Sequence, residues 1–363
     1  MKKLITLAAL FAFCLTVSLA DTARAQNDKT FSWRLASVWA EGFPLLESER
    51  AFAKRVEEMS GGRLKIKVFP DGQIGPANQV LDLVSSGAVE MGGDWPNYWS
   101  GKNTAFDLLG SHVMGFSPND YYNWIYAGGG KAFYDEFYGK FGCVYFPHHS
   151  HDMESGIRSS KPINSLADFK GLKIRMAGLI QGKLIQAFGA QPVSVALGEV
   201  YEAMQRGVVD ACEISVPVVD ESTKIYEVAK FWLTPGFHQT SSIHGIMINK
   251  KKWDQLPDDL KAIVAAAAEA NLLTRLAQTT IQSAEATNKI LEAGVTITRF
   301  NDVDLAEIEK AKNRIMSDLA KQNPDYARIL KHQVEFEKNF ANYRKAMEPW
   351  SFGRSWQSFP ELP

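Results

Sequence analysis

The sequence predicts an α/β protein made of two similar domains that face each other across a cleft. Residues 165–215 alternate between helical and strand patterns, and a group of residues near position 80 recurs 120 positions later. A chain of 363 residues is also too long for one small core and fits two domains. In open α/β sheets ligands bind beyond the carboxyl ends of the strands, so the same pattern indicates where a site should lie.

The first 25 residues have the pattern of a secretory signal peptide. Lys2 and Lys3 precede an apolar run over residues 4–19, and a small-residue cleavage site follows at residues 23–25. The apolar run is short for a membrane-spanning helix, which needs about 20 residues. We therefore expect an exported chain that begins near Gln26.

Charge and cysteine content narrow the possible partners. Loss of residues 1–25 changes the formal net charge from −1 to −3, a mild value that argues against a nucleic-acid partner. Cys143 and Cys212 remain, and export to an oxidising compartment makes a disulfide possible. Both cysteines lie in apolar, strand-like runs, where an unpaired buried cysteine is equally ordinary, so both alternatives stay open.

The first domain is predicted to alternate strands and helices. The expected elements are a strand over residues 31–37, a helix over 44–59, a strand over 63–70, a helix that ends near Ser86 and a strand over 88–93. The last two elements belong to the internal repeat, in which a helix ends at a glycine and leads into a short strand. The repeated residues are Val80, Gly87, Val89 and Glu90, which recur as Val200, Gly207, Val209 and Asp210.

Aromatic and imidazole side chains follow the predicted strands of this domain. Trp95, Tyr98 and Trp99 lie in an expected loop, where they either pack in the core or form an apolar wall for a ligand. A second group comprises His148, His149, His151 and Asp152. It lacks a zinc-binding spacing, and we expect some of its members to line the cleft and others to be solvated.

The second domain supplies the charged site residues. A strand over residues 172–176 alternates apolar residues with Lys173 and Arg175, so Arg175 lies on its polar face. Three elements follow: a helix entered between Gly178 and Gly182, a strand over 192–195, and a helix that ends at Gly207. The next strand brings Glu213 to its carboxyl end.

Three helices are predicted near the C-terminus, over residues 257–292, 304–319 and 325–347. The last has an aromatic-rich stripe that packs either on its own body or on a partner. The stripe comprises Tyr326, Ile329, Gln333, Phe336, Phe340, Tyr343 and Met347.

Several segments, in this order and spacing, resemble the solute receptors of the tripartite ATP-independent periplasmic (TRAP) transporters. They are WRLAS at 33–37, RLKIKVFP at 63–70, the triple glycine at 128–130, SSKPINSLADFKGLKIR at 159–175 and GEVYEAMQRGVVDACEIS at 198–215. The resemblance covers roughly residues 30–350 and is strongest to the receptors for 2-oxo and 2-hydroxy monocarboxylates. It implies a two-lobed periplasmic binding protein fold, with lobe I over 26–148 and 242–300, lobe II over 149–241, and C-terminal helices over 301–363.

The resemblance also implies a set of site residues. Arg175 corresponds to the family's carboxylate clamp, and a guanidinium can form two parallel hydrogen bonds to a carboxylate. Glu154 falls where the family commonly has an amide that binds a cation, so the carboxylate is a departure. The expected ligand-binding residues are Arg175, Glu154, Glu213, Trp95, Tyr98, Asp152 and Gln239; His238 and His244 are weaker candidates. The expected metal ligands are Glu154, Glu213, Gln239 and the backbone carbonyl of Ile214, and these oxygens favour Ca²⁺ or Na⁺.

The expected function is therefore recognition and not catalysis. The receptor would capture a pyruvate- or lactate-like acid in the periplasm and deliver it to the small and large permease subunits of the membrane. The resemblance also implies a homodimer that exchanges C-terminal helices. A C4-dicarboxylate, a sugar acid and a secreted enzyme using the same cleft remain alternatives, although no hydrolase or dinucleotide motif is present.

Overall fold

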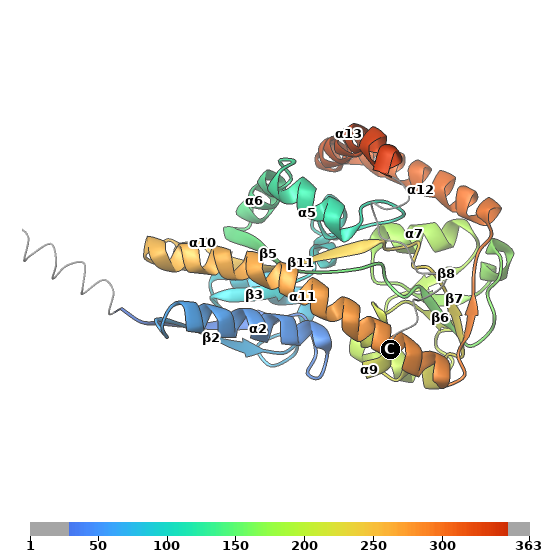
Figure 1. The fold of residues 1–363 in the computed structure, drawn as a ribbon, viewed down its shortest axis with the longest axis horizontal. Coiled ribbons are helices and arrows are strands. Elements are labelled where there is room, and N and C mark those ends of the chain that lie inside the picture. The colour runs from blue at the N-terminus through green and yellow to red at the C-terminus, as the bar shows by residue number, and fades with distance from the viewer. Residues whose placement is uncertain (1–28, 348–363) are drawn as a thin grey trace, which may run out of the picture.

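The computed structural model describes residues 29–347. It confirms an α/β fold of two lobes, each with its own mixed sheet, and helices added at the C-terminal end (Figure 1). The predicted signal peptide and residues 348–363 of the predicted C-terminal region lie outside the described residues. Within residues 29–347, no helix has the length and apolar character needed to cross a bilayer.

The first lobe contains a six-stranded sheet in the order β2-β1-β3-β11-β4, with β5 beside β11. Its strands are β1 (Phe31–Ser37), β2 (Leu64–Phe69), β3 (Met91–Asp94), β4 (Ser111–His112), β5 (Cys143–His151) and β11 (Ser241–Asn249). Its helices are α2 (Pro44–Met59), α3 (Val80–Ser86), α4 (Phe106–Gly110), α5 (Pro118–Tyr126), α6 (Lys131–Gly139) and α10 (Lys250–Trp253). The strands β2, β1 and β3 are parallel, whereas β11 runs antiparallel to each of its neighbours.

The second lobe contains a six-stranded sheet in the order β12-β10-β6-β9-β7-β8. Its strands are β6 (Ile157–Ser159), β7 (Lys173–Arg175), β8 (Gln191–Val193), β9 (Ala211–Cys212), β10 (Phe231–Leu233) and β12 (Thr296–Thr298). Its helices are α7 (Leu179–Ala187), α8 (Val200–Gln205) and α9 (Pro217–Ser222). The strands β8, β7 and β9 are parallel, as β2, β1 and β3 are in the first lobe.

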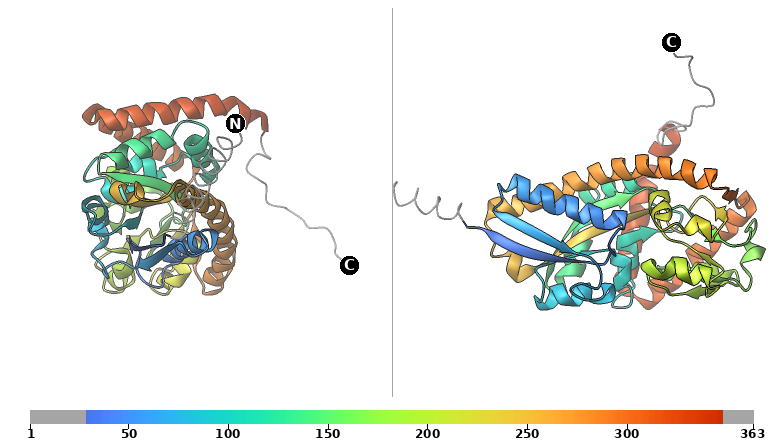
Figure 2. Two further views of the ribbon diagram at one scale, coloured as in Figure 1. Left: turned by 90° about the vertical axis from the view of Figure 1, so that its left-hand side faces the viewer. Right: turned by 90° about the horizontal axis from the view of Figure 1, so that it is seen from below.

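The long helix α11 (Asp258–Glu292) connects the two lobes (Figures 1 and 2). Its 35 residues extend about 50 Å, enough to pass from β5 and α2 in the first lobe to α9 in the second. Because α11 carries the chain across, β12 pairs with β10 in the second sheet. Residues 296–298, which were expected in lobe I as part of 242–300, thus belong to the sheet of the second lobe. Residues 149–151, which were expected in lobe II, continue β5 of the first sheet.

The internal repeat is present in the structure. Leu35 lies opposite Met91 between β1 and β3, and Ile174 lies opposite Ala211 between β7 and β9. The turns after α3 and α8 contain Gly87 (φ 79°) and Gly207 (φ 68°), a left-handed conformation that favours glycine.

The repeated acidic residues also make equivalent contacts. The carboxylate of Glu90 accepts a hydrogen bond from the backbone N–H of Arg34 on β1 (3.0 Å). The carboxylate of Asp210 accepts one from the backbone N–H of Lys173 on β7 (2.9 Å). Each lobe is therefore built on the same β-strand and helix unit.

The two cysteines belong to different sheets and are free. Cys143 lies in β5 and Cys212 in β9, and both are buried. Burial raises the pKa of Cys143 to about 12 and raises that of Cys212 as well. The structure thus supports the unpaired alternative over a disulfide.

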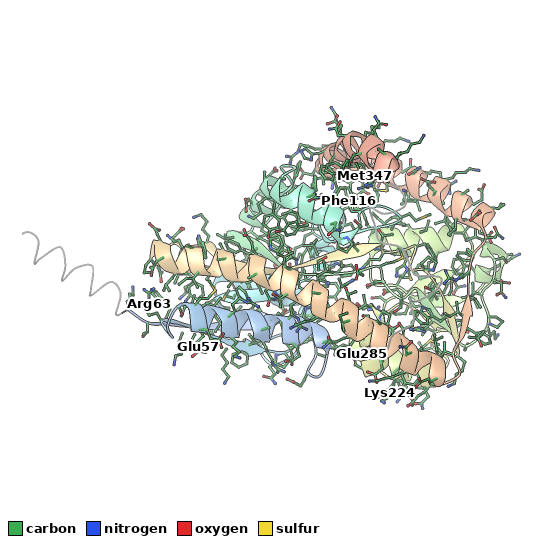
Figure 3. The ribbon with its side chains drawn as sticks, viewed as in Figure 1. Glu57, Arg63, Phe116, Lys224, Glu285 and Met347 are labelled. Atoms are coloured by element: carbon green, nitrogen blue, oxygen red, sulfur yellow. The ribbon has the colours of Figure 1, made fainter. Side chains whose placement is uncertain are left out.

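The C-terminal helices α12 (Asp302–Gln322) and α13 (Pro324–Met347) cover one side of both lobes (Figure 1). The first part of α13 packs on its own body, where Tyr326, Ile329 and Gln333 are buried. Near its end Arg344 still pairs with Asp120 of α5, but Tyr343 and Met347 (the latter labelled on this helix in Figure 3) are 59% and 47% exposed. The predicted stripe therefore passes from buried residues through the half-buried Phe336 and Phe340 to an exposed end.

We predict that Asp210→Ala lowers the free energy of unfolding by about 1–2 kcal/mol, because the Lys173 N–H loses a charged acceptor inside the sheet. Urea unfolding of both proteins measures the change. Asp318→Ala, which removes a carboxylate from an exposed ion pair on α12, serves as the control and should change stability by less than about 0.5 kcal/mol. Equal losses in the two variants would contradict the prediction.

Candidate functional site

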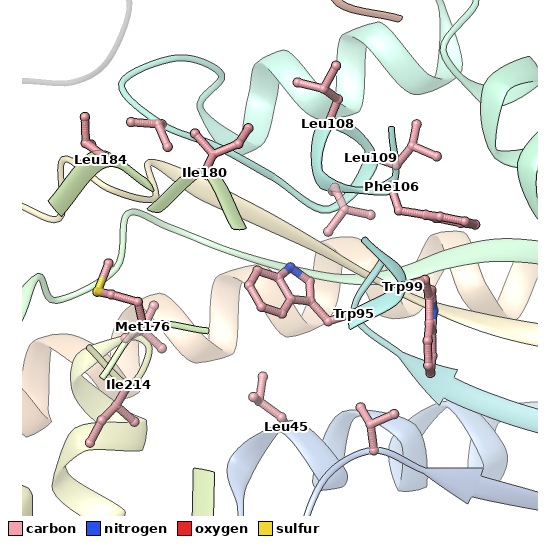
Figure 4. Close-up of a cluster of buried hydrophobic side chains, with 14 of the residues drawn as sticks. Leu45, Trp95, Trp99, Phe106, Leu108, Leu109, Met176, Ile180, Leu184 and Ile214 are labelled. Carbon is pink, nitrogen blue, oxygen red and sulfur yellow. The ribbon is translucent and has the colours of Figure 1, made fainter. Parts of the chain in front are cut away.

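One narrow cavity lies between the lobes, at the carboxyl ends of β1, β3, β7 and β9. The space inside it for the centre of a water-sized sphere is about 20 Å³, room for about one water molecule, so the cavity is almost closed in this structure. Its wall comprises Trp39, Leu45, Trp95, Tyr98, His151 and His244 from the first lobe, Arg175, Ala177, Leu197, Glu213, Ile214 and Ser215 from the second, and Glu154 and Gln239 from the connecting segments. Figure 4 shows Trp95 and Leu45 on one side and Ile214 on the other.

Arg175 and Glu213 form a buried ion pair in the wall of this cavity. Arg175 ends β7, and Glu213 directly follows the neighbouring parallel strand β9, so both side chains emerge at the same edge of the sheet. The Nη1 atom of Arg175 donates to Glu213 Oε1 (2.9 Å) and to the Glu213 carbonyl (2.8 Å). Its Nε atom donates to the carbonyl of Val195 (3.1 Å).

These bonds limit how Arg175 can bind a ligand. Within residues 29–347, the hydrogen bonds of this guanidinium use Nε and Nη1 and leave Nη2 without a protein partner. The sequence suggested that two nitrogens of the guanidinium would bind a carboxylate ligand. In the structure one of the guanidinium nitrogens, Nη1, instead binds Glu213 and positions it. Arg175 is thus held rigidly by its own lobe.

Glu154 lies on the segment between β5 and β6 and is 5% exposed. Its Oε2 atom is 2.9 Å from His238 Nε2, and its Oε1 atom accepts a hydrogen bond from Gln239 Nε2 (2.8 Å). Gly236 makes this approach possible, because a Cβ there would lie 2.2 Å from the carbonyl oxygen of Glu154. The two segments that connect the lobes therefore meet at Glu154.

Burial raises the pKa of both acidic side chains. For Glu154 burial raises it to about 7, with Asp220 adding to the effect and His151 and Arg175 opposing it. For Glu213 burial again raises the pKa; Arg175 opposes this effect and Glu154 increases it. The two carboxyl groups thus resist ionising together in the same cavity.

A cation fits this arrangement. Glu154, Glu213 and His238 each offer a ligand atom, and these atoms lie within 4.8 Å of one another. The predicted ligands Glu154 and Glu213 are therefore brought together, and His238, a weaker candidate from the sequence, lies beside them. Gln239 turns its amide nitrogen to Glu154 and its oxygen to Gln181, so in this arrangement it acts as a donor and not as an oxygen ligand.

The other predicted ligand-binding residues divide into two groups. Trp95, Tyr98 and Ile214 line the cavity as expected. Asp152 does not: its side chain is exposed and its carboxylate accepts a hydrogen bond from Thr280 on α11. Trp99 also faces away, because its indole N–H donates to Asp94 in the core (2.6 Å).

The three histidines of the predicted group and His244 are all buried. The exposed fractions are 1% for His148 and His151, 2% for His149 and 4% for His244, so the solvated member of the predicted group is Asp152 and none of its histidines. His151 and His244 line the cavity. Within the described residues, the candidate metal group is that of Glu154, Glu213 and His238, and it does not include the predicted histidine cluster.

Trp39 and Gln181 were missed by the sequence analysis. Trp39 follows β1 and lines the cavity, so the rule that ligands bind beyond strand ends could have identified it. Gln181 lies on α7 and donates to Gln239 Oε1 (3.2 Å) and to Ser111 Oγ (3.1 Å) across the lobes. No sequence signal distinguishes such an interlobe contact.

Comparisons with known proteins identify the family. Residues 35–323 match the family described as bacterial extracellular solute-binding protein, family 7. A monocarboxylate 2-oxoacid-binding periplasmic protein of Nostoc sp. is 32% identical over 320 residues, covering 88% of this chain and 85% of that protein. A 2,3-diketo-L-gulonate-binding periplasmic protein of Escherichia coli is 29% identical over 289 residues, covering 78% and 85%.

Solved structures show the same fold. A TRAP transporter solute-binding protein of Bordetella bronchiseptica, a mixed-occupancy dimer with calcium and picolinate, has a TM-score of 0.85, 28% identity and coverage of 88% and 96%. A receptor of Colwellia psychrerythraea with bound calcium and pyruvate is 28% identical, and one of Pseudoalteromonas atlantica with bound sodium and pyruvate is 27% identical. Both have a TM-score of 0.82, and each match covers 88% of this chain and 98% of the other chain.

The chain belongs to this family of TRAP solute-binding proteins. It is a periplasmic binding receptor of a transporter and not an enzyme.

We predict that Glu154 makes the metal-free protein less stable as the pH rises. The carboxyl group ionises near 4.5 in the unfolded chain and near 7 in the folded protein, so the unfolded state releases its proton first. The free energy of unfolding should therefore fall through this interval, by up to about 3 kcal/mol.

Urea unfolding in chelator at pH 5 and pH 8 tests this prediction, with Glu154→Gln as the comparison. The amide does not titrate, so the variant should lack this part of the loss between the two pH values. Parallel pH dependences in the two proteins would show that Glu154 does not titrate abnormally.

Proposed function

We propose that this receptor binds a small 2-oxo or 2-hydroxy monocarboxylate together with a metal cation and delivers it to membrane permease subunits. The observation that supports this most directly is the meeting of Arg175, Glu213 and Glu154 in one small interlobe cavity. The pyruvate-bound relatives and the 2-oxoacid-binding relative support the same ligand class.

The charges in the cavity explain why a cation would be required. Among the described residues that line the cavity, Arg175 is the only arginine or lysine, and Glu213 already pairs with it. An incoming carboxylate would then join Glu154 and Glu213 with too little positive charge nearby. A bound cation supplies that charge, and ionised Glu154 and Glu213 would hold it with the ligand oxygens.

The donor atoms favour a hard cation. Two carboxylates, the Ile214 carbonyl and the oxygens of a 2-oxo or 2-hydroxy acid are ligands that suit Ca²⁺ or Na⁺. The carboxylate of Glu154, in place of the amide common in the family, adds a negative charge and favours Ca²⁺. We propose that His238 positions Glu154 through its hydrogen bond at 2.9 Å.

The cavity wall favours one carboxylate over two. A second carboxylate would have no second arginine or lysine partner there, and Trp39, Trp95 and Tyr98 surround the space with aromatic rings. A C4-dicarboxylate is therefore the weaker candidate. A sugar acid remains the alternative, because the Escherichia coli relative is a 2,3-diketo-L-gulonate-binding protein.

Arg175→Lys is predicted to weaken binding of pyruvate by about 1.5–3 kcal/mol. The ammonium cannot reproduce the guanidinium bonds that position Glu213 and reach the ligand. Titration calorimetry with pyruvate measures the change, and Arg206→Lys on the exposed end of α8 is the matched control. Equal affinities of the Arg175 variant and the parent would remove Arg175 from the site.

Removal of metal ions is predicted to lower ligand affinity. Ca²⁺ should restore it better than Mg²⁺, because Mg²⁺ requires a tight octahedral shell and releases its waters reluctantly. Glu213→Ala should abolish the metal effect. Calorimetry in chelator-treated buffer, with sodium also replaced, checks this; full affinity there would show that no cation takes part.

We also propose that the receptor is a homodimer that uses the exposed end of α13. Tyr343→Glu with Met347→Glu should give a monomer without lowering the melting temperature, because both side chains are exposed. Light scattering measures the mass, and Val303→Glu on α12, where the side chain is 73% exposed, should leave the dimer intact. A monomeric parent protein at micromolar concentration would contradict the proposal.

A further inference from the structure

Within residues 29–347, two histidines of the cavity wall form no hydrogen bond with Arg175, Glu213 or Glu154. His151 and His244 both line the cavity and are 1% and 4% exposed. They come from β5 and β11 of the first lobe, whereas Arg175 and Glu213 come from the second. The cavity therefore presents imidazole rings as well as aromatic rings to the ligand.

A β-bulge brings these rings together. In the pairing of β5 with β11, Gly245 lies opposite Pro147 and His244 lies opposite His149, so His148 is the extra residue of the bulge. The centroid of the His244 ring is 5.1 Å from that of His149 and 5.2 Å from that of His151. Bulges commonly occur beside binding sites, where they redirect side chains.

The hydrogen bonds of His151 determine what its ring offers. Its Nδ1 atom is 2.8 Å from the backbone carbonyl of Asp152. A carbonyl oxygen only accepts, so Nδ1 carries the hydrogen, and Nε2 of the neutral ring has a lone pair. His151 in this form offers a hydrogen-bond acceptor.

His244 has an unused hydrogen-bonding capacity. Both of its ring nitrogens are buried without a hydrogen-bond partner within the described residues, and the same is true of His149. Buried polar atoms nearly always have a partner, and one left without a bond costs free energy. Burial also lowers the pKa of His244, which favours a neutral ring with one donor and one acceptor. Trp39 packs edge-on against this ring at 5.3 Å and helps to fix it.

We propose that His151 and His244 select ligands that have a hydroxyl group on the carbon next to the 2-oxo or 2-hydroxy position. A hydroxyl both donates and accepts, so it can bond to the lone pair of His151 and to the ring of His244. An alkyl group in the same place would leave these atoms without partners. This inference rests on the proposed function and differs from the apolar ligand tail that Trp95 and Tyr98 alone suggest.

Calorimetry with three acids in calcium-containing buffer tests the selectivity. Pyruvate is the reference, and hydroxypyruvate and 2-oxobutanoate differ from each other by a hydroxyl in place of a methyl group. The parent protein should bind hydroxypyruvate at least about tenfold more tightly than 2-oxobutanoate. D-glycerate against 2-hydroxybutanoate gives a second pair with the same difference.

Variants then assign the selectivity to the histidines. His244→Phe and, separately, His151→Phe should reduce the ratio of the two affinities toward one, whereas His244→Gln, which keeps a donor and an acceptor, should retain part of it. His332→Phe is the matched control, because His332 lies on α13 against Trp124 and outside the cavity. The ratio of affinities is insensitive to a general loss of folded protein.

The outcomes separate this inference from the proposed function. Binding of pyruvate without a preference for hydroxypyruvate would overturn the histidine assignment and leave the proposed function intact. A preference that survives in both phenylalanine variants would also overturn it. If the parent protein binds none of these acids, the proposed function and this inference both fail.

Discussion

The buried pair of Arg175 and Glu213 is the contact on which the rest of the site depends. Two adjacent parallel strands end side by side, and each places one charged side chain at that edge. With side-chain exposures of 4% and 5%, neither charge could remain there without the other. Breaking the pair would leave an uncompensated buried charge, so it fixes both the position of Glu213 and the orientation of the guanidinium.

Glu154 extends this electrostatic arrangement across the two segments that connect the lobes. The His238 ring and the Gln239 amide contact both of its oxygens, and its backbone N–H donates to the Gln239 carbonyl (3.1 Å). The acid is therefore held by the segment that leads into β11. Any movement of one lobe relative to the other must involve these contacts, which links the cation site to the geometry of the connection.

The two lobes use one structural unit for different purposes. In each lobe a helix ends at a left-handed glycine, and an acidic residue then accepts a bond from the first strand. Beyond that unit the lobes differ, because the first contributes mainly aromatic and imidazole rings to the cavity and the second contributes the ion pair. The site is therefore asymmetric although the lobes are built alike.

The sequence by itself determined the elements and the residues at strand ends, because these depend on local patterns. Alternation of apolar residues placed Arg175 on a strand, and the glycine-ended repeat predicted two similar lobes. Order and spacing of motifs identified the family. Long-range contacts could not be predicted in this way. Only the tertiary structure decided that Asp152 turns to Thr280, that His238 meets Glu154, and that β12 joins the second sheet. These contacts join residues that lie far apart in the chain, and they form only when α11 and the connecting segments bring the lobes together.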